Sequence, residues 1–305
     1  MLAMLAFTPS ASAYSMLGQS SSRPAITVFN GEFFAWKGVT GDNSIWTATI
    51  NRNGQSVAKS MYARTDIGPA LAGWGNRVAL AWKGDQDSRI YVATSGDGTN
   101  WSPPSAVTGS NTLNMPTMAV FDNVLYVAWR GPDSGLYMTW TLDGTSWGAV
   151  QHAVPDGGSG DAPSLTATNT GIAMAWRGLN SDSRLFYSRY ANNRWAPQQI
   201  AAPGANSLSP PALVPARSGP NLTLGTGLRL AWRETEFRVM SSYMEENGPW
   251  KGPVGVPNGA ETPTRSLTGP NLIAYNNGDD PRIVWLTWHD HLTDRVLNDQ
   301  SIIPS

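Results

Sequence analysis

A tryptophan that follows a small residue recurs six times along the chain, and this repeat restricts the possible folds more than any other feature. The tryptophans are Trp36, Trp82, Trp129, Trp176, Trp232 and Trp288, with nearly equal intervals between the first four and longer, equal intervals between the last three. A proline lies upstream of each one, at Pro24, Pro69, Pro116, Pro163, Pro211 and Pro270. Internal similarity at such a spacing is the signature of repeat architectures, in which each unit buries its apolar face against the next.

The pattern within each unit predicts four short antiparallel strands. An apolar stretch and a tight turn such as "WGNR" precede the tryptophan, and a loop, an apolar-aromatic run such as "RIYVATS" and, in several units, a "DG" turn with a second tryptophan follow it. Such runs bounded by Gly, Asn and Asp are hairpin signals. Four strands about every 45 residues, without sustained helical periodicity, predict an all-β chain that forms a six-bladed β-propeller in a single domain, residues 1–305.

The two ends of the chain carry complementary fragments of the unit. The sixth unit stops after its third strand, near "RVLNDQSIIPS". In complete units a second tryptophan, such as Trp147, precedes the next repeated one, such as Trp176, at a nearly constant distance, and the same distance counted back from Trp36 reaches Phe7. We therefore expect the N-terminal strand to close the ring and remove two exposed sheet edges. The alternative is that this segment is the tail of a secretory signal, because "ASA" resembles a cleavage site.

The composition excludes several classes of function. Lysine plus arginine number 21 against 22 aspartate plus glutamate, which gives no electrostatic footprint for a nucleic-acid backbone. We therefore expect no nucleic-acid partner. No apolar run approaches the roughly 20 residues that span a bilayer, so we expect no membrane insertion either. The chain has no cysteine, which excludes disulfides, thiolate ligands and cysteine nucleophiles. We expect no metal and no cofactor.

A basic residue follows each repeated tryptophan, and an acid lies three to five residues further on. The basic residues are Lys37, Lys83, Arg130, Arg177, Arg233 and His289, and the acids are Asp42, Asp87, Asp133, Asp182, Glu236 and Asp294. Strand alternation places the basic side chain on the opposite face from the tryptophan. One interpretation is a structural ion pair in every blade. The other is a ligand-binding site at every blade or blade interface.

Aromatic residues on the third strands support the second interpretation. They are Trp46, Tyr91, Tyr137, Phe186 and Tyr187. A carbohydrate site needs an aromatic face against the apolar side of the sugar, together with a cation and a carboxylate that bond its hydroxyl groups. The pattern therefore predicts glycan-binding sites that contain these aromatic, basic and acidic residues.

Two turns and the repeat as a whole resemble known propellers. The turns "SGDGTNW" and "TLDGTSW" resemble a shortened Asp-box of sialidase-like propellers, and the repeat resembles fucose-lectin-like propellers. That resemblance implies sugar binding by an arginine, an acid and aromatic residues between blades, although the spacing of those groups is not reproduced here. It also implies that Asp97 and Asp143 bond the backbone of their own turns. A carbohydrate-binding, lectin-like protein is the function that we expect from the sequence.

The units also differ, and the differences support other functions. The distance from the proline to the repeated tryptophan is nearly constant in the first four units but longer in the last two, from Pro211 to Trp232 and from Pro270 to Trp288. Elaborated loops on one side of a ring favour a single pocket. The alternative function is a biosynthetic enzyme of the natural-product cyclase or hetero-Diels–Alderase type, which acts on a small hydrophobic molecule and needs neither a metal nor a covalent intermediate. A protein-interaction scaffold is the third possibility.

Other sequence features add weaker candidates. His289, Asp290 and His291 cluster in the sixth unit and are candidate catalytic residues, although a degenerate last repeat explains them equally well. The surroundings of Arg23, "SRPAI", match a sialidase poorly, so we do not expect glycoside hydrolysis. Sequons at Asn100 and Asn221, with the signal-like N-terminus, favour a secreted protein.

Overall fold

The computed structural model describes residues 20–51, 54–55, 59–155, 157–218, 223–234, 238–255, 270–276, 281–288 and 297–302. These residues form strands, turns and loops, and there is no helix among them. The strands make six antiparallel sheets, which we number in chain order. The all-β prediction is confirmed.

Sheets 2 and 3 have the predicted four strands in the predicted order, whereas sheet 1 has a fifth strand because two strands pair with its third. Sheet 1 contains β1 (Ala25–Val28), β2 (Glu32–Lys37), β3 (Ser44–Asn51), β4 (Gly54–Gln55) and β5 (Lys59–Arg64). Sheet 2 contains β6 (Ala70–Trp74), β7 (Arg77–Lys83), β8 (Ile90–Ser95) and β9 (Ser105–Ala106). Sheet 3 contains β10 (Thr117–Phe121), β11 (Val124–Arg130), β12 (Leu136–Thr141) and β13 (Gln151–His152).

The last three sheets have the same order with local variations. Sheet 4 contains β14 (Ser164–Thr168), β15 (Gly171–Arg177), β16 (Leu185–Ala191), β17 (Arg194–Trp195) and β18 (Gln199–Ala201). Sheet 5 contains β19 (Ala212–Ser218), β20 (Thr223–Arg233), β21 (Val239–Met244) and β22 (Trp250–Gly255). Sheet 6 contains β23 (Asn271–Asn276), β24 (Pro281–Trp288) and β25 (Leu297–Ile302).

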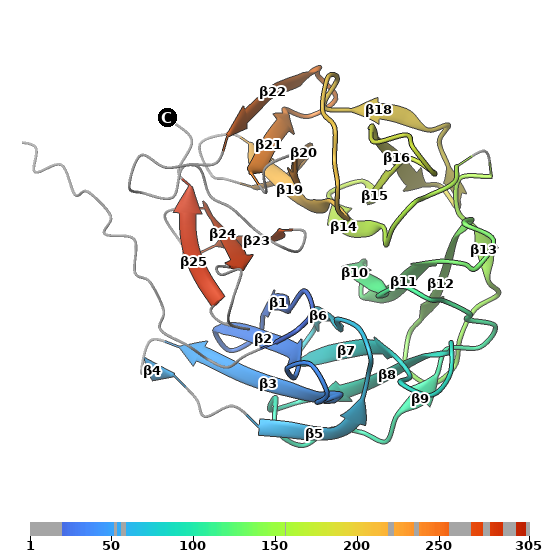
Figure 1. Ribbon diagram of the computed structural model, residues 1–305, viewed down its shortest axis with the longest axis vertical. Helices are drawn as coiled ribbons and strands as arrows, with labels where there is room; N and C mark the ends of the chain where they lie inside the picture. Colours follow the sequence, from blue (N-terminus) through green and yellow to red (C-terminus); the bar gives the residue numbers. More distant parts are fainter. Residues whose placement is uncertain are drawn as a thin grey trace, which may run out of the picture.

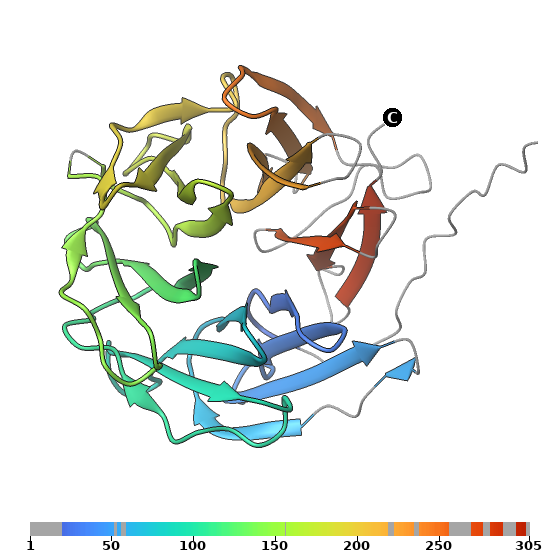
Figure 2. The same cartoon turned by 180° about the vertical axis from the view of Figure 1, so that it is seen from behind.

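The sheets are arranged around a common centre, with the first strand of each one innermost (Figures 1 and 2). Consecutive inner strands contact one another from β1 to β23, and β23 also contacts β1. Sheet 6 has three strands in the described part of the chain, as expected for a unit that stops after its third strand. The N-terminal segment that we expected to close the ring lies in residues 1–19, outside the described residues.

The repeated tryptophans join each sheet to the preceding one. Trp82, Trp129, Trp176 and Trp232 are at most 3% exposed, and each lies in an apolar cluster that combines residues of its own sheet with residues of the sheet before it. Burying one indole removes roughly 150–250 Å² from water, an upper limit of about 4–6 kcal/mol at 25 cal/mol/Å². The recurrence of this residue therefore reflects the packing between units.

The third-strand aromatic residue stacks on the tryptophan of the second strand. The ring centroids of Trp82 and Tyr91 are 6.0 Å apart with an interplanar angle of 24°, and Trp129 and Tyr137 are 6.0 Å apart at 23°. Both pairs are directly opposite one another across neighbouring strands. Cross-strand pairing thus sets the position of the aromatic residues that we selected from the sequence.

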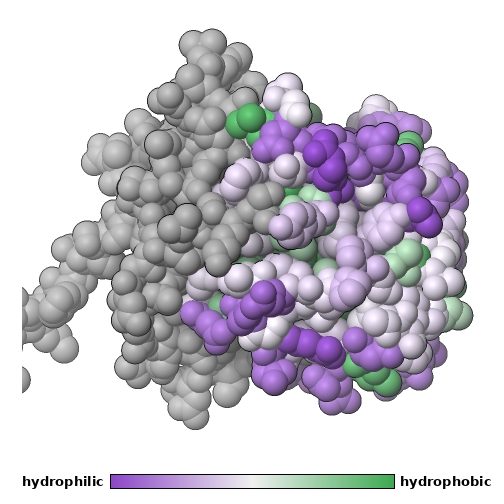
Figure 3. All heavy atoms as spheres, turned by 90° about the horizontal axis from the view of Figure 1, so that it is seen from below, coloured by the Kyte–Doolittle hydropathy of each residue, from purple (hydrophilic) through white to green (hydrophobic). Residues whose placement is uncertain are grey.

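The outer surface is mostly polar where it is visible. Seen from the side that Figure 3 presents, hydrophilic residues cover most of the described surface, and hydrophobic ones are scattered in small groups. In the described part of the chain, no helix is long and apolar enough to cross a membrane.

Candidate functional site

The predicted ion pair between the basic residue and the acid of the same unit is not formed in sheets 1 to 4. The Nζ atom of Lys83 instead lies 2.9 Å from a carboxylate oxygen of Asp66, and Nε of Arg177 lies 2.8 Å from Oδ2 of Asp161. Both acids belong to the linker that enters the sheet. The interpretation as an ion pair within the turn is therefore wrong for these units, because the basic group bonds a linker aspartate, a carbonyl or a hydroxyl group instead of the carboxylate of its own turn.

The remaining described basic residues bond hydroxyl and carbonyl groups. Lys37 donates to Oγ of Ser21 at 2.9 Å and to the carbonyl of Asp42 at 3.1 Å. Nε of Arg130 donates to the Ser159 carbonyl at 2.6 Å, and Nη2 of Arg233 donates to the Leu208 carbonyl at 2.9 Å. The side chain of Lys37 is buried and those of Arg130 and Arg233 are half-buried. Through these hydrogen bonds, all three side chains hold a loop or a linker in place.

The predicted acids do lie beside the predicted aromatic residues. Oδ2 of Asp42 accepts a hydrogen bond from the indole N–H of Trp46 at 3.1 Å. The hydroxyl of Tyr91 donates to Asp87 at 2.9 Å, and that of Tyr137 donates to Asp133 at 2.6 Å. We call these three pairs the rim pairs, since they lie where the second and third strands connect.

The acids of the rim pairs are ionised. Hydrogen bonds from Ser44 lower the pKa of Asp42, and the hydroxyl of Tyr137 lowers the pKa of Asp133. The pKa of Asp87 is lowered as well. Its slight burial raises this pKa, but the hydrogen bonds from Arg89 and Tyr91 together lower it by more. Arg89 donates to Asp87 through Nε and Nη2 at 2.9 and 2.7 Å, which occupies most of that carboxylate.

Sheet 4 departs from the rim pairs. Phe186, not Tyr187, stacks on Trp176, and the acid Asp182 is bonded to Arg184 at 2.8 Å. Tyr187 therefore does not take the role of Tyr91 or Tyr137 that we assigned to it from the sequence. The reason is the alternation of side chains along β16, which directs Tyr187 to the opposite face, toward sheet 5.

Tyr187 instead borders a solvent-open cavity between sheets 4 and 5. The cavity has a volume of about 200 Å³, and its lining includes Arg189, Gln199, Met244 and Asn247. The hydroxyl of Tyr187 donates to Oε1 of Gln199 at 2.5 Å. We call this cavity the inter-sheet pocket.

Arg189 supplies the positive charge of the inter-sheet pocket. Its Nη2 atom donates to the Thr226 carbonyl at 2.6 Å and lies 3.5 Å from the Glu246 carbonyl and 3.7 Å from the sulfur of Met244. Burial lowers the pKa of Arg189, which nevertheless stays far above neutral for a guanidinium group. Thr226 belongs to the β19–β20 hairpin, the elaborated turn that the sequence analysis identified.

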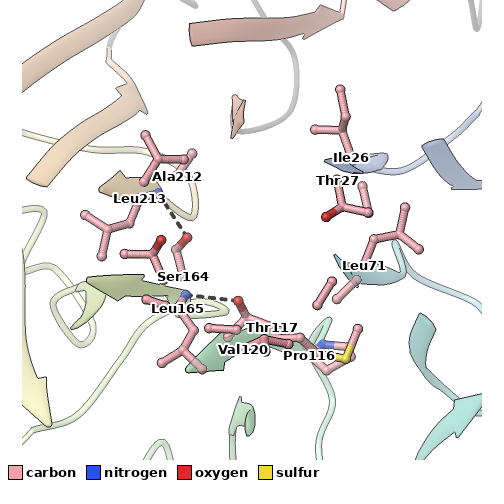
Figure 4. A pocket seen from close by; sticks show the side chains of 18 of the residues that line it. Ile26, Thr27, Leu71, Pro116, Thr117, Val120, Ser164, Leu165, Ala212 and Leu213 are labelled. Carbon is pink, nitrogen blue, oxygen red and sulfur yellow. Dashed lines mark hydrogen bonds between the residues drawn. The ribbon is translucent and has the colours of Figure 1, made fainter. Parts of the chain in front are cut away.

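A larger cavity lies at the common centre of the sheets. It has a volume of about 490 Å³ and is lined by the inner strands β1, β6, β10, β14 and β19. Hydrogen bonds from the Leu165 amide to Thr117 and from the Leu213 amide to Ser164, both 3.0 Å, link neighbouring inner strands at its wall (Figure 4).

Equivalent positions of the units supply the wall of this central cavity. The residues that follow the repeated prolines in sheets 1 to 5 are all small: Ala25, Ala70, Thr117, Ser164 and Ala212. Arg23 lies at the edge of the cavity, where its Nη1 donates to the Pro211 carbonyl across the ring at 3.3 Å. Burial lowers the pKa of Arg23 to about 10.

One functional position escaped the sequence analysis. A serine or threonine lies four residues before each repeated proline, at Ser20, Thr65, Thr112, Ser159, Ser207 and Ser266. The first five are at most 5% exposed, and Ser266 lies outside the described residues. At Ser159, Oγ accepts from the Asp161 amide at 3.2 Å and lies 3.1 Å from the Arg177 carbonyl, so it joins the linker to the second strand. The fixed distance from the proline was the signal.

The two aspartate turns behave as expected. Oδ1 of Asp97 accepts from the amides of Thr99 and Asn100 at 2.7 Å, and Asp143 does the same with Thr145 and Ser146. These backbone bonds lower the pKa of both carboxylates strongly. The prediction that Asp97 and Asp143 stabilise their own turns is confirmed.

Several predicted residues lie outside the described part of the chain. They are Glu236, His289, Asp290, His291, Asp294 and the sequon residue Asn221. The other sequon residue, Asn100, is exposed, and its amide donates to Asp97 at 2.7 Å. Among the described residues, no group of histidines and acids is arranged to bind a metal ion.

The protein is similar to solved structures, whereas its sequence has no match. No family model matches the sequence, and no curated protein matches it. Among solved structures, AofleA from Arthrobotrys oligospora is 12% identical with a TM-score of 0.64, covering 95% of this chain and 89% of its own. The SapL1 lectin in complex with α-methyl fucoside is 15% identical with a TM-score of 0.61, covering 94% of this chain and 98% of its own.

A third solved structure belongs to the lectin of Aleuria aurantia, in a mutant form bound to Fucα1-6GlcNAc. It is 13% identical with a TM-score of 0.60, covering 90% of this chain and 89% of its own. Another structure of that lectin is described as a six-bladed β-propeller with a novel fucose recognition mode. At these identities the likeness concerns the fold: the chain has the fold of the fucose-binding β-propeller lectins.

Proposed function

We propose that the protein is a carbohydrate-binding, lectin-like propeller, in which the six sheets are the six blades of a closed ring. The contacts of consecutive inner strands, including that of β23 with β1, support the closed ring. The structural likeness to lectins bound to fucosides supports carbohydrate as the ligand class. A glycan is accordingly the partner that we expect.

The inter-sheet pocket is the observation that carries this proposal. It is a cavity of about 200 Å³ at a blade interface and is open to solvent, a volume suited to one sugar ring. It offers hydrogen-bonding groups from Arg189, Gln199 and Asn247, beside the apolar surfaces of Pro197 and Met244. Sugars present hydroxyl groups at their edges and C–H groups on their faces, so both kinds of surface are required for recognition.

The repeated residues of the rim are a second set of candidate sites. The rim pairs Asp42–Trp46 and Asp133–Tyr137 combine an ionised carboxylate with an aromatic ring, as a sugar site requires. Asp87 is a weaker candidate, because Arg89 already bonds it. The basic residues from Lys37 to Arg233 would contribute less directly to binding, since they bond the linkers.

The central cavity favours binding over catalysis. A cyclase requires a pocket whose walls differ from one another, so that the substrate is held in one orientation. In the described part of the chain, this cavity is lined by equivalent positions of the blades, which are small residues next to the prolines and larger apolar ones such as Leu71, Leu165 and Leu213 after them. The single-pocket enzyme thus remains an alternative without an observation that favours it.

Isothermal titration with fucose, galactose, N-acetylglucosamine and sialic acid tests the proposal. We expect binding with a stoichiometry near one, abolished by Gln199→Ala together with Arg189→Ala and unchanged by Asp42→Ala. A stoichiometry of two or more that falls in Asp42→Ala and Asp133→Ala would assign binding to the rim pairs instead. Absence of heat with all four sugars, confirmed on a glycan array, would contradict a lectin-like function.

A further inference from the structure

The inter-sheet pocket contains a positive charge that no acidic side chain balances within the described part of the chain. The only hydrogen-bond partners of the Arg189 guanidinium there are the Thr226 and Glu246 carbonyls and the Met244 sulfur, all through Nη2. The Nε and Nη1 groups have no hydrogen bond among the described residues. Arg189 therefore retains donors and its full charge for a ligand.

The acids on the adjoining β21–β22 turn do not neutralise Arg189. The carboxylate of Glu245 forms an ion pair with Lys251 at 2.8 Å. Glu246 meets Arg189 through its backbone carbonyl, and its side chain is exposed to solvent. By contrast, Lys83 and Arg177 of the repeated basic positions each face an aspartate.

The amide group of Gln199 adds to the excess of donors. Its oxygen accepts the hydroxyl hydrogen of Tyr187, so the amide nitrogen remains as the free group and presents two N–H bonds. The Tyr187 hydroxyl has used its hydrogen in the same contact. The free polar groups of Arg189 and Gln199 are thus donors, and they require acceptors on the ligand.

A charged residue at the position of Arg189 is specific to the interface between sheets 4 and 5. By their pairing with the second strands, the residues that correspond to Arg189 in sheets 1, 2, 3, 5 and 6 are Thr49, Thr94, Trp140, Tyr243 and Gln300. None of them is charged. A cation at this third-strand position therefore occurs once in the described sheets.

We propose that the inter-sheet pocket binds an acidic saccharide, with the carboxylate of a uronic acid residue bonded by Arg189 and Gln199. This inference rests on the proposed carbohydrate-binding function and specifies its ligand class. A carboxylate supplies four acceptor sites and a negative charge, which matches the free donors better than the hydroxyl groups of a neutral sugar do. The apolar face of the ring would lie against Pro197 and Met244.

The test compares two ligands that differ only at C6, methyl α-D-galacturonide with its carboxylate and methyl α-D-galactoside with its hydroxymethyl group, titrated into the full-length protein. We expect the galacturonide to bind about tenfold more tightly, because charge-assisted hydrogen bonds are stronger than neutral ones. Arg189→Gln should remove this preference, and Arg189→Lys should retain part of it. Arg194→Gln is the matched control, since Arg194 is an exposed residue of the same sheet outside the pocket lining, and should leave the preference intact.

A second variant protects the test against misfolding. Asn247→Asp adds a negative charge to an exposed position of the lining without altering the bonds of Arg189, and it should weaken the galacturonide about tenfold while leaving the galactoside unchanged. Equal affinity for the two ligands, lowered equally by Arg189→Gln, would overturn the acidic ligand class and leave the lectin-like function standing. Binding of neither ligand, with no binding on an array of neutral and acidic glycans, would overturn both proposals.

Discussion

Lys83 forms an ion pair with Asp66, which lies 17 residues before it, and not with Asp87, which lies four residues after it. The side chain of Lys83 is 9% exposed, so the pair fastens the linker that enters sheet 2 to the end of its second strand. Arg177 and Asp161 are related in the same way in sheet 4. In sheets 2 and 4 the basic residue after the repeated tryptophan thus fastens the linker to its own sheet.

Removing Asp66 should destabilise the protein more than removing Asp87. Asp66→Ala leaves a buried ammonium group without its carboxylate, and we expect a loss of about 1–2 kcal/mol, less than for a fully buried pair because Asp66 is half exposed. Asp87→Ala removes the exposed bonds from Arg89 and the part-buried bond from Tyr91, and it should cost less than about 1 kcal/mol. Urea unfolding of both variants measures the difference, and equal losses would contradict the assignment of Lys83 to the linker.

The buried hydroxyl before each proline should be important for stability. Ser159→Ala leaves the Asp161 amide and the Arg177 carbonyl with fewer partners, and we expect a loss of about 1–3 kcal/mol. Ser181→Ala, at an exposed position of the same sheet, is the control and should change little. Thermal unfolding of the two variants tests this expectation. It is contradicted if Ser159→Ala has the same melting temperature as the wild type.

The aspartate turns should make stability depend on acid pH. The pKa of Asp143 is lower in the folded protein than the value of about 3.9 in an unfolded chain, so its contribution is present above that value and is lost as pH falls further. Asp143→Asn keeps an acceptor but cannot titrate. We therefore expect its melting temperature to decline less between pH 5 and pH 2 than that of the wild type.

Tyr187 should affect ligand binding through Gln199. Tyr187→Phe removes the hydroxyl that fixes the Gln199 amide, so the side chain loses its orientation and we expect affinity to fall by about 3- to 10-fold. Tyr62→Phe is the control, because Tyr62 is fully exposed on sheet 1. Isothermal titration with the sugar that binds most tightly is the measurement, and unchanged affinity in Tyr187→Phe would exclude this role.

The all-β architecture could be predicted from the sequence because it depends on local and repeated signals. The spacing of Trp82, Trp129 and Trp176, with a turn on either side of each strand, specifies one supersecondary unit several times over. The resemblance of two turns to an Asp-box implied that Asp97 and Asp143 bond their own turns, and these local bonds span only two or three residues.

The candidate site was predicted only in part. The rim pairs were found because the acid and the aromatic residue are four residues apart on one connection. The partner of Lys83 was missed, because Asp66 lies on the linker before sheet 2. Only the folding of that linker against the end of β7 brings Asp66 near Lys83.

The sequence by itself determined the repeating unit, the residues that each strand buries and the local turns, because these depend on side-chain periodicity over a few positions. The tertiary structure decided which units meet and which way a side chain near an interface extends. Tyr187 and Arg189 lie on β16, whereas the Thr226 carbonyl and Met244 that complete the pocket belong to sheet 5. A cavity between two sheets depends on contacts between distant segments, and no repeat within one segment encodes them.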